Sequence, residues 1–334
     1  MNRTIRNLLG VCLLLGVVVA GAGIYHYKTT LETPISLGND VFAVSRGDSL
    51  SSITNDLVNR GLLKEPYTVR IYSRLNDTGS NIQAGEYRFP EPITIPQLID
   101  WLSSGKGQVG MKVTIIEGWN FRQMREAIAS APKLEKKTTG WDDARLMQEL
   151  GHPDLHPEGQ FYPDTYVYRL GDSDMTLYRK AFNIMQEKLE QAWDMRNPDI
   201  QLTTPYEALI MASIVEKESQ VADELNEISG VFNNRLRKGM RLQTDPTVIY
   251  GVGEDYDGDI TRKHLKTDTP YNTYTRHGLP PTPISLPAYP ALLAAVQPSE
   301  TKSLYFVASG GGRHKFSKTL EEHNAAVKKY ILGQ

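Results

Sequence analysis

The most distinct hydrophobic pattern in the sequence is a charge-free, mostly apolar run from Leu8 to Tyr25. Its 18 residues approach the roughly 20 that an α-helix needs to cross a bilayer. Basic residues precede the run and a large polar remainder follows it, which favours an N-terminus inside and a body outside. A cleaved signal peptide is the alternative, with Ala-Gly-Ala at 20–22 as its cleavage site. Because the run exceeds the usual apolar core of a signal peptide, we predict an uncleaved single anchor over residues 1–28.

A small α+β module is predicted next, over residues 29–110. Residues 41–44 alternate as a short strand does, and the turn at Gly47 leads into an amphipathic helix that Asp48 or Ser49 can cap. A second helix, a strand signal and a third helix follow. The order of strand, Gly-Asp-Ser-Leu turn and helix resembles the first half of a LysM module, a small peptidoglycan-binding fold. A structural module with no sugar contact is the open alternative.

Residues 111–334 alternate between helical and strand patterns and form the third predicted part. A stretch with five prolines, 270–287, is too proline-rich for regular structure, and the apolar residues after Pro246 suggest a strand. The predicted fold class is therefore α+β. It comprises a single N-terminal transmembrane helix, a small LysM-like α+β module and a larger α+β catalytic domain.

One helix of this third part carries a candidate catalytic acid. The helix is predicted to begin at Thr204-Pro205 and to reach about Gln220, with Thr at the N-cap and Pro in the first turn. At about 100° per residue, Glu218 falls on the same side as Met211 and Val215. A carboxyl group among apolar neighbours is costly to ionise, so its pKa should rise toward the range of a general acid. A solvated or salt-bridged glutamate is the ordinary alternative.

Two neighbours of Glu218 receive the opposite interpretation. Glu216 and Lys217 project from other sides of the helix and are expected to be solvated. Glu216 is therefore expected to be replaceable.

Composition and motifs exclude several classes of chemistry. A formal net charge of -2, without long blocks of one sign, gives no indication of nucleic-acid binding. The one cysteine, Cys12, lies inside the apolar run and is not a nucleophile. His152 and His156 have H-x-x-x-H spacing, but adjacent prolines and the missing Glu argue against a zinc site. With no Gly-rich phosphate loop or G-x-S-x-G motif either, we expect neither a metal nor a cofactor.

Carboxylate chemistry on a sugar polymer remains. Ordinary glycosidases use two carboxylates, and Asp245 is the best second acid in this sequence. A single acid suffices if the substrate supplies its own nucleophile, as the 6-hydroxyl of a muramyl residue can. Several polar and aromatic residues in the segments that follow suit a saccharide or can hold Glu218 in place: Gln243, Asp245, Tyr271, Asn272, Tyr274 and, more weakly, Asn234.

Long motifs then give a resemblance that covers nearly the whole chain. The segments EGQFYPDTY, IVEKES, GVFNNRLRKGMRLQTDPTVIYG, YNTYT and GLPPTPI closely resemble the MltG/YceG-like endolytic murein transglycosylases. In that family the second Glu of the E-K-E element is the catalytic acid, which implies Glu218. The resemblance further implies cleavage of nascent glycan strands between N-acetylmuramic acid and N-acetylglucosamine, leaving 1,6-anhydro ends. It also implies peptidoglycan synthases as partners and a location at the periplasmic face of the bacterial inner membrane.

Three hypotheses follow from these observations. The first is a membrane-anchored lytic transglycosylase that uses Glu218 alone and terminates the elongation of glycan strands. The second is a muramidase that uses Glu218 and Asp245 to add water. The third is a non-catalytic peptidoglycan-binding scaffold of the cell-wall synthesis machinery.

Overall fold

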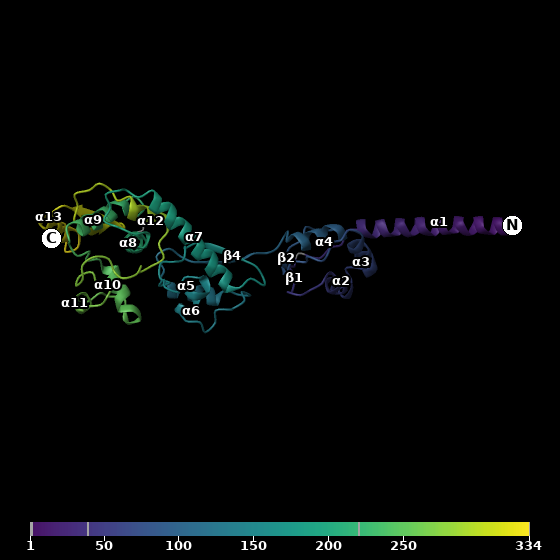
Figure 1. The fold of residues 1–334 in the computed structure, drawn as a ribbon, viewed down its shortest axis with the longest axis horizontal. Coiled ribbons are helices and arrows are strands. Elements are labelled where there is room, and N and C mark those ends of the chain that lie inside the picture. Colours follow the sequence, from purple (N-terminus) through teal and green to yellow (C-terminus); the bar gives the residue numbers. More distant parts are fainter. Residues whose placement is uncertain (1–2, 39, 220, 334) are drawn as a thin grey trace. The chain divides into compact units, whose positions relative to one another are not determined.

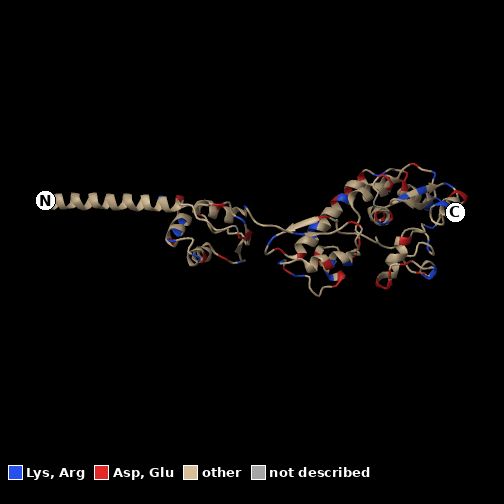
Figure 2. Cartoon of the chain, turned by 180° about the vertical axis from the view of Figure 1, so that it is seen from behind, with Lys and Arg blue, Asp and Glu red and all other residues tan. Residues whose placement is uncertain are grey.

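A computed structural model describes residues 3–38, 40–219 and 221–333 of the chain (Figure 1). It divides into two compact units. The first contains the residues up to Met111, together with 133–135 and 167–172, and the second contains the rest. Helices and short strands alternate in both units, so the α+β class is confirmed. Figure 2 shows both signs of charge mixed over the body of the chain.

The first unit begins with helix α1, Arg3–Glu32. The helix Ile5–Glu32 is long and apolar enough to cross a membrane; its large apolar side chains up to Tyr25 are exposed, whereas Leu31 is buried. The prediction of an N-terminal apolar helix is thus confirmed, although the helix continues past residue 28 because no Gly or Pro interrupts residues 28–32. Length and composition of this kind fit both a membrane anchor and a signal sequence.

A small α+β module follows α1 in the same unit. Strands β1 and β2 pair antiparallel, with Phe42 opposite Tyr87, and Tyr87 is fully buried beneath the helices. Ser49 caps the first helix of the module through a reciprocal bond with Ser52. The elements are β1 Phe42–Val44, α2 Leu50–Asn59, α3 Pro66–Leu75, β2 Gly85–Tyr87 and α4 Ile95–Ser104.

The remainder of the chain holds the larger core. Near its end, Tyr305–Gly310 (β5) and Arg313–Ser317 (β6) pair antiparallel in a two-stranded sheet. In chain order the elements are β3 Met111–Thr114, α5 Phe121–Ser130, α6 Asp143–Leu150, β4 Thr165–Tyr168, α7 Asp174–Asp194, α8 Pro205–Glu218, α9 Leu225–Arg237, α10 Asp245–Val252, the 3₁₀ turn η1 Gly253–Asp255, α11 Arg262–Lys266, α12 Tyr289–Val296, β5 Tyr305–Gly310, β6 Arg313–Ser317 and α13 Leu320–Tyr330.

Helix α8 is the centre of the second unit. Thr204 caps it through a bond from the amide of Glu207, and Pro205 opens its first turn, as predicted. Helices α7, α9 and α12 pack against it. Every residue from Ala208 to Val215 is buried, so the prediction of a single apolar stripe is wrong. Neighbours thus cover the middle of α8 on all sides, and only its first and last turns reach solvent.

Two boundaries differ from the sequence-based interpretation. Helix α8 ends at Glu218, because Ser219 already has extended backbone angles, φ −148° and ψ 140°; Gln220 lies outside the described residues. The segment after Thr244, interpreted as a strand, is helix α10. Thr244 is its N-cap residue and Pro246 occupies its first turn, where proline fixes a helical φ and loses no hydrogen bond.

Candidate active site

Glu218 is half-buried at the C-terminal end of α8. The hydroxyl of Thr244 donates a hydrogen bond to its Oε1. Burial raises the pKa of Glu218 to about 7, and the nearby charge of Asp245 adds to this rise. The bond from Thr244 and the charge of Arg235 act in the opposite direction and are outweighed. A carboxyl group that binds and releases a proton near neutral pH is suited to general acid–base chemistry.

Arg235 of α9 supports the segment that brings Thr244 to Glu218. Its side chain is buried, and its Nη1 donates to the carbonyl of Leu242 at 2.9 Å and to Oε1 of Gln243 at 3.3 Å. Gln243 itself has a positive φ of 49°, which side-chain-bearing residues rarely adopt. The predicted site residue Gln243 therefore forms part of the turn that leads into α10.

Asp245 and Tyr274 form a pair beside Glu218. The Tyr274 hydroxyl donates to Oδ1 of Asp245 at 2.5 Å, and Asp245 is exposed. Burial and the charge of Asp245 raise the pKa of Tyr274, so its hydroxyl stays protonated. The charge of Asp245 acts on the pKa of Glu218 and that of Glu218 on the pKa of Tyr274, so both predicted residues lie near the acid.

Asn272 has a structural position. Its side chain is 1% exposed, and its amide donates to the carbonyls of His264, Leu265 and Thr267. Its Oδ1 accepts from the amide of Tyr274 at 2.8 Å. Because the side chain is enclosed and hydrogen-bonded at both ends, the interpretation of Asn272 as a saccharide ligand is corrected.

Asn234 is bonded to a different part of the fold. Its amide donates to the carbonyls of Thr301 and Ser303, at 2.8 and 3.1 Å, and its Oδ1 accepts from Arg237. These bonds attach α9 to the segment before β5. The described contacts of Asn234 thus do not include Glu218, contrary to the suggestion that it orients the acid.

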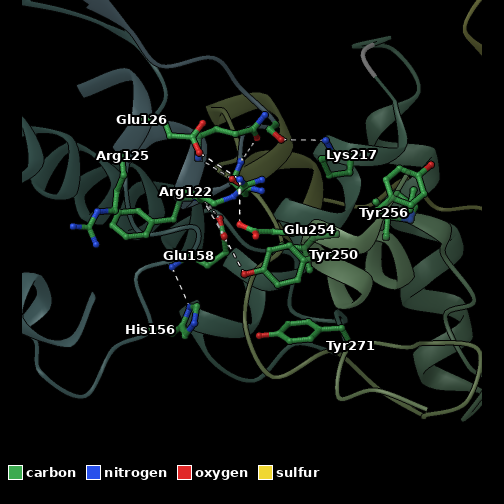
Figure 3. A pocket seen from close by; sticks show the side chains of 18 of the residues that line it. Arg122, Arg125, Glu126, His156, Glu158, Lys217, Tyr250, Glu254, Tyr256 and Tyr271 are labelled. Atoms are coloured by element: carbon green, nitrogen blue, oxygen red, sulfur yellow. Dashed lines mark hydrogen bonds and ion pairs between the residues drawn. The ribbon is translucent and has the colours of Figure 1, made fainter. Parts of the chain in front are cut away.

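A cavity of about 1100 Å³ lies in the second unit (Figure 3). Tyr271, a predicted site residue, is on its wall together with Tyr250. The Tyr271 hydroxyl shares a hydrogen bond of 2.9 Å with Thr282. Lys217 and Pro246, the sequence neighbours of Glu218 and Asp245, also line the cavity, whereas Glu218 and Asp245 themselves are not among its lining residues.

Glu158 lines the same cavity and was not identified from the sequence. It is 3% exposed, and burial raises its pKa to about 7. The amide of Phe121 and the hydroxyl of Tyr250 donate to its carboxyl group, which Figure 3 shows beside Tyr250. The available signal was its place in the motif EGQFYPDTY, between a proline and a glycine.

The neighbours of Glu218 differ from each other. Lys217 is exposed and donates to the carbonyl of Gly118, whereas Glu216 is half-buried. Glu216 Oε2 accepts from the amide of Ala288, the N-cap residue of α12, at 2.9 Å. The expectation that Glu216 is solvated is therefore wrong, because the start of α12 covers that side of α8.

The two histidines considered for metal binding have other contacts. The ring of His152 packs against that of Phe182, with the ring centroids 4.5 Å apart. Nδ1 of His156 accepts a hydrogen bond from the amide of Glu158 at 3.2 Å. Within the described residues no three His, Cys, Asp or Glu side chains gather as a metal site would require.

The chain is similar to proteins of one family. The YceG-like family matches residues 42–329. An endolytic murein transglycosylase of Bacillus subtilis strain 168 is 31% identical over 338 residues, which cover 95% of this chain and 92% of that protein. The endolytic murein transglycosylase of Streptococcus pneumoniae strain D39 is 23% identical over 94% of this chain and 63% of its own length.

A solved structure gives the same result. The crystal structure of a yceG-like protein from Listeria monocytogenes is 32% identical and superposes with a TM-score of 0.55 over 86% of this chain and 98% of its own. A half-buried carboxyl group with a pKa of about 7 and a separate cavity lined by polar and aromatic side chains are features typical of an enzyme. The chain belongs to the YceG-like family, and the recognition of the transglycosylase family is confirmed.

Proposed function

We propose that this chain is an endolytic murein lytic transglycosylase that uses Glu218 as its acid and base. The observation that carries the proposal is the half-buried carboxyl of Glu218, with a pKa of about 7, held by the hydroxyl of Thr244. The names of the relatives in Bacillus and Streptococcus support the substrate class. The bond cut is the β-1,4 link between N-acetylmuramic acid and N-acetylglucosamine in nascent glycan strands.

The reaction needs one acid in two successive states. Protonated Glu218 first gives its proton to the leaving O4 of N-acetylglucosamine, and the C1–O4 bond breaks. The resulting carboxylate then accepts the proton of the muramyl 6-hydroxyl while O6 bonds to C1. The product carries a 1,6-anhydro ring, no water is consumed, and Glu218 regains its proton.

A pKa near 7 suits both steps. At neutral pH protonated and ionised forms of Glu218 coexist, so neither donation nor acceptance requires a rare state. The charge of Asp245 raises the pKa of Glu218, which favours the acid form before the bond breaks. Asp245 acts in this proposal through its charge.

A two-carboxylate muramidase is the second candidate, because Asp245 is close enough to Glu218 to affect its ionisation. In that reaction Asp245 would activate water or attack C1. The hydrogen bond from Tyr274 holds Asp245 and favours the electrostatic function over direct attack. The third hypothesis, a non-catalytic scaffold, has no need of a raised pKa at Glu218.

The substrate contacts are proposed from the residues on the cavity and around the acid. Tyr271 offers a ring on the cavity wall, and Tyr274 and Asp245 offer polar atoms beside Glu218. Gln243 is exposed at the turn before α10 and can donate to a sugar hydroxyl.

Cellular placement completes the proposal. Helix α1 is the single-pass anchor in the bacterial inner membrane, with the body on the periplasmic side, where peptidoglycan synthases are its partners. The basic residues before the apolar run support this orientation. The β1–α2–α3–β2 order supports a LysM-like module over residues 29–110 that contacts the glycan, followed by a catalytic domain over 111–334.

Product analysis tests the reaction. The full chain in detergent is incubated with purified glycan strands, and the new ends are identified by mass. We expect 1,6-anhydro-muramic ends with wild type, none with Glu218→Gln, and wild-type products with Glu190→Gln, whose exposed carboxyl lies on α7.

Each other result has one meaning. Ends heavier by one water would establish the muramidase. Full activity of Glu218→Gln would exclude Glu218 as the acid. Binding of strands without cleavage by wild type would support the scaffold.

A further inference from the structure

Glu158 is a buried carboxyl group that the proposed reaction does not use. Its Oε1 and Oε2 accept from the amide of Phe121 at 3.0 and 3.2 Å, and the Tyr250 hydroxyl donates to Oε2 at 3.0 Å. The groups that act on its pKa are backbone amides, this hydroxyl and the negative charge of Asp143, with no cation among them. Burying a carboxyl group in this way costs stability, so its presence on a cavity wall points to a function.

The bond with Glu158 fixes one end of an aromatic pair. The rings of Tyr250 and Tyr271 meet edge to face, with centroids 4.8 Å apart and planes at 62°. The other end of the pair is fixed by the bond between the hydroxyls of Tyr271 and Thr282. Both rings line the cavity, and aromatic faces contact the C–H surfaces of sugar rings favourably.

Helix α10 connects this pair to the catalytic acid. Thr244, its N-cap residue, bonds to Glu218, and Tyr250 in its body bonds to Glu158. Two carboxyl groups thus hold the same short helix, one at its start and one at its cavity face. A change at Tyr250 therefore acts on the cavity wall and on the same short helix whose N-cap residue holds the acid.

We propose that Glu158 is a positioning residue for the glycan: through Tyr250 it holds the Tyr250–Tyr271 pair as an aromatic wall for uncharged N-acetylated sugar rings. The proposal rests on the proposed function for its ligand class. It adds to that function a specific part of the strand-binding surface, formed by residues from α10 and the irregular segment before α12.

A purely structural carboxyl group would behave differently, and the chain offers one for comparison. Asp174 is also 3% exposed and accepts from the amides of Lys137 and Thr138 and from the Thr138 hydroxyl. It does not line the cavity. Asp174→Asn therefore removes a similarly bonded buried charge without touching the aromatic wall.

Kinetics on purified glycan strands test the proposal. We expect Glu158→Leu, which removes the acceptor of the Tyr250 hydroxyl, and Tyr250→Phe, which removes the donor, to raise KM about three- to tenfold, the size of an aromatic contact, with kcat within about twofold of wild type. The double variant should be no worse than Glu158→Leu, because both single changes break the same bond between Glu158 and Tyr250. Asp174→Asn and Tyr166→Phe, which loses a buried bond to the Tyr162 carbonyl, should keep the wild-type KM.

Binding separates this proposal from the reaction itself. Calorimetry with glycan strands in the Glu218→Gln background should show the same three- to tenfold weakening of binding when Glu158→Leu or Tyr250→Phe is added. If the parent binds strands and the added substitutions weaken this binding, but wild type makes no anhydro ends, the proposed reaction is refuted and the positioning function of Glu158 is supported. Equal affinity in all variants, or no glycan binding by the parent, overturns the positioning. If Glu158→Leu does not fold, Tyr250→Phe gives the same test.

Discussion

The hydroxyl of Thr244 donates its hydrogen bond to the carboxyl group of Glu218, so the N-cap residue of α10 holds the side chain at the end of α8. The two residues are 26 positions apart in the sequence. The bond stabilises the ionised form of Glu218 against the burial that disfavours it. The ionisation of the acid therefore depends on where α10 begins.

Thr244→Val removes this bond while nearly preserving the side-chain shape. The pKa of Glu218 should rise further, because a donor to the carboxylate is lost. The pH above which kcat/KM falls should then rise by roughly half a unit to one unit, as expected for the loss of one hydrogen bond. A pH–rate profile checks this, and a shift to lower pH would contradict it. Thr244→Ser, which keeps the hydroxyl, should retain the wild-type profile.

Asp245→Asn should have the opposite effect on the same profile. The negative charge of Asp245 raises the pKa of Glu218, so its removal lowers that pKa. The fall of kcat/KM should begin at lower pH, with activity retained on the acid side. Loss of activity at every pH would instead show that Asp245 takes part directly in the chemistry.

Protein stability should decrease between pH 4.5 and 7. Glu158 has a folded-state pKa of about 7 against an ordinary value of 4.5, so the folded state binds more protons in this window. Its contribution is complete below pH 4.5 and is lost as the pH rises through 7, on the order of 3 kcal/mol in all. Calorimetric scans of Glu158→Gln should show a smaller fall in Tm from pH 5 to 8. A fall equal to that of wild type would refute the assigned ionisation.

Glu216→Ala should weaken the fold and leave the chemistry intact. The change removes the bond to the amide of Ala288 at the start of α12, a loss of about 1–2 kcal/mol in free energy of unfolding. Denaturant titration measures this loss, and Glu190→Ala on an exposed part of α7 serves as the control. A large drop in kcat without loss of stability would assign Glu216 to the reaction.

Asn272→Ala distinguishes a structural amide from a ligand. Removing it takes the side-chain donor away from the partly buried carbonyls of His264, Leu265 and Thr267, so the free energy of unfolding should fall by about 1–3 kcal/mol. The KM of the folded protein should stay near that of wild type. A raised KM at unchanged stability would restore the earlier interpretation of Asn272 as a saccharide contact.

The predictions from sequence were most accurate where local chemistry decides the structure. The start of α8 follows from Thr204 and Pro205, since a capping hydroxyl and a first-turn proline act within one turn. The apolar run that forms α1 is equally local. At α10 the same signals, Thr244 and Pro246, were present, but the residues after them are β-branched and were interpreted as a strand.

The parts that sequence could not give depend on contacts between distant segments. Glu158 bonds to Phe121, 37 positions away, and to Tyr250, 92 positions away, so no local pattern reports its burial. Asn272 was interpreted as a possible saccharide contact, because two of its carbonyl acceptors belong to the short helix α11 and the third follows it, and this helix was not predicted. Glu216 was interpreted as solvated because the start of α12, 72 positions later, covers it.

The enclosure of α8 has a consequence for protein engineering. A helix surrounded on all sides offers no position from Ala208 to Val215 where a larger side chain fits without strain. Libraries directed at these eight residues should return mostly unfolded proteins. Substitutions intended to alter the glycan preference should therefore be made in α10 and the proline-rich loop. The sequence of α8 from Ala208 to Val215 has to be kept in any redesigned enzyme.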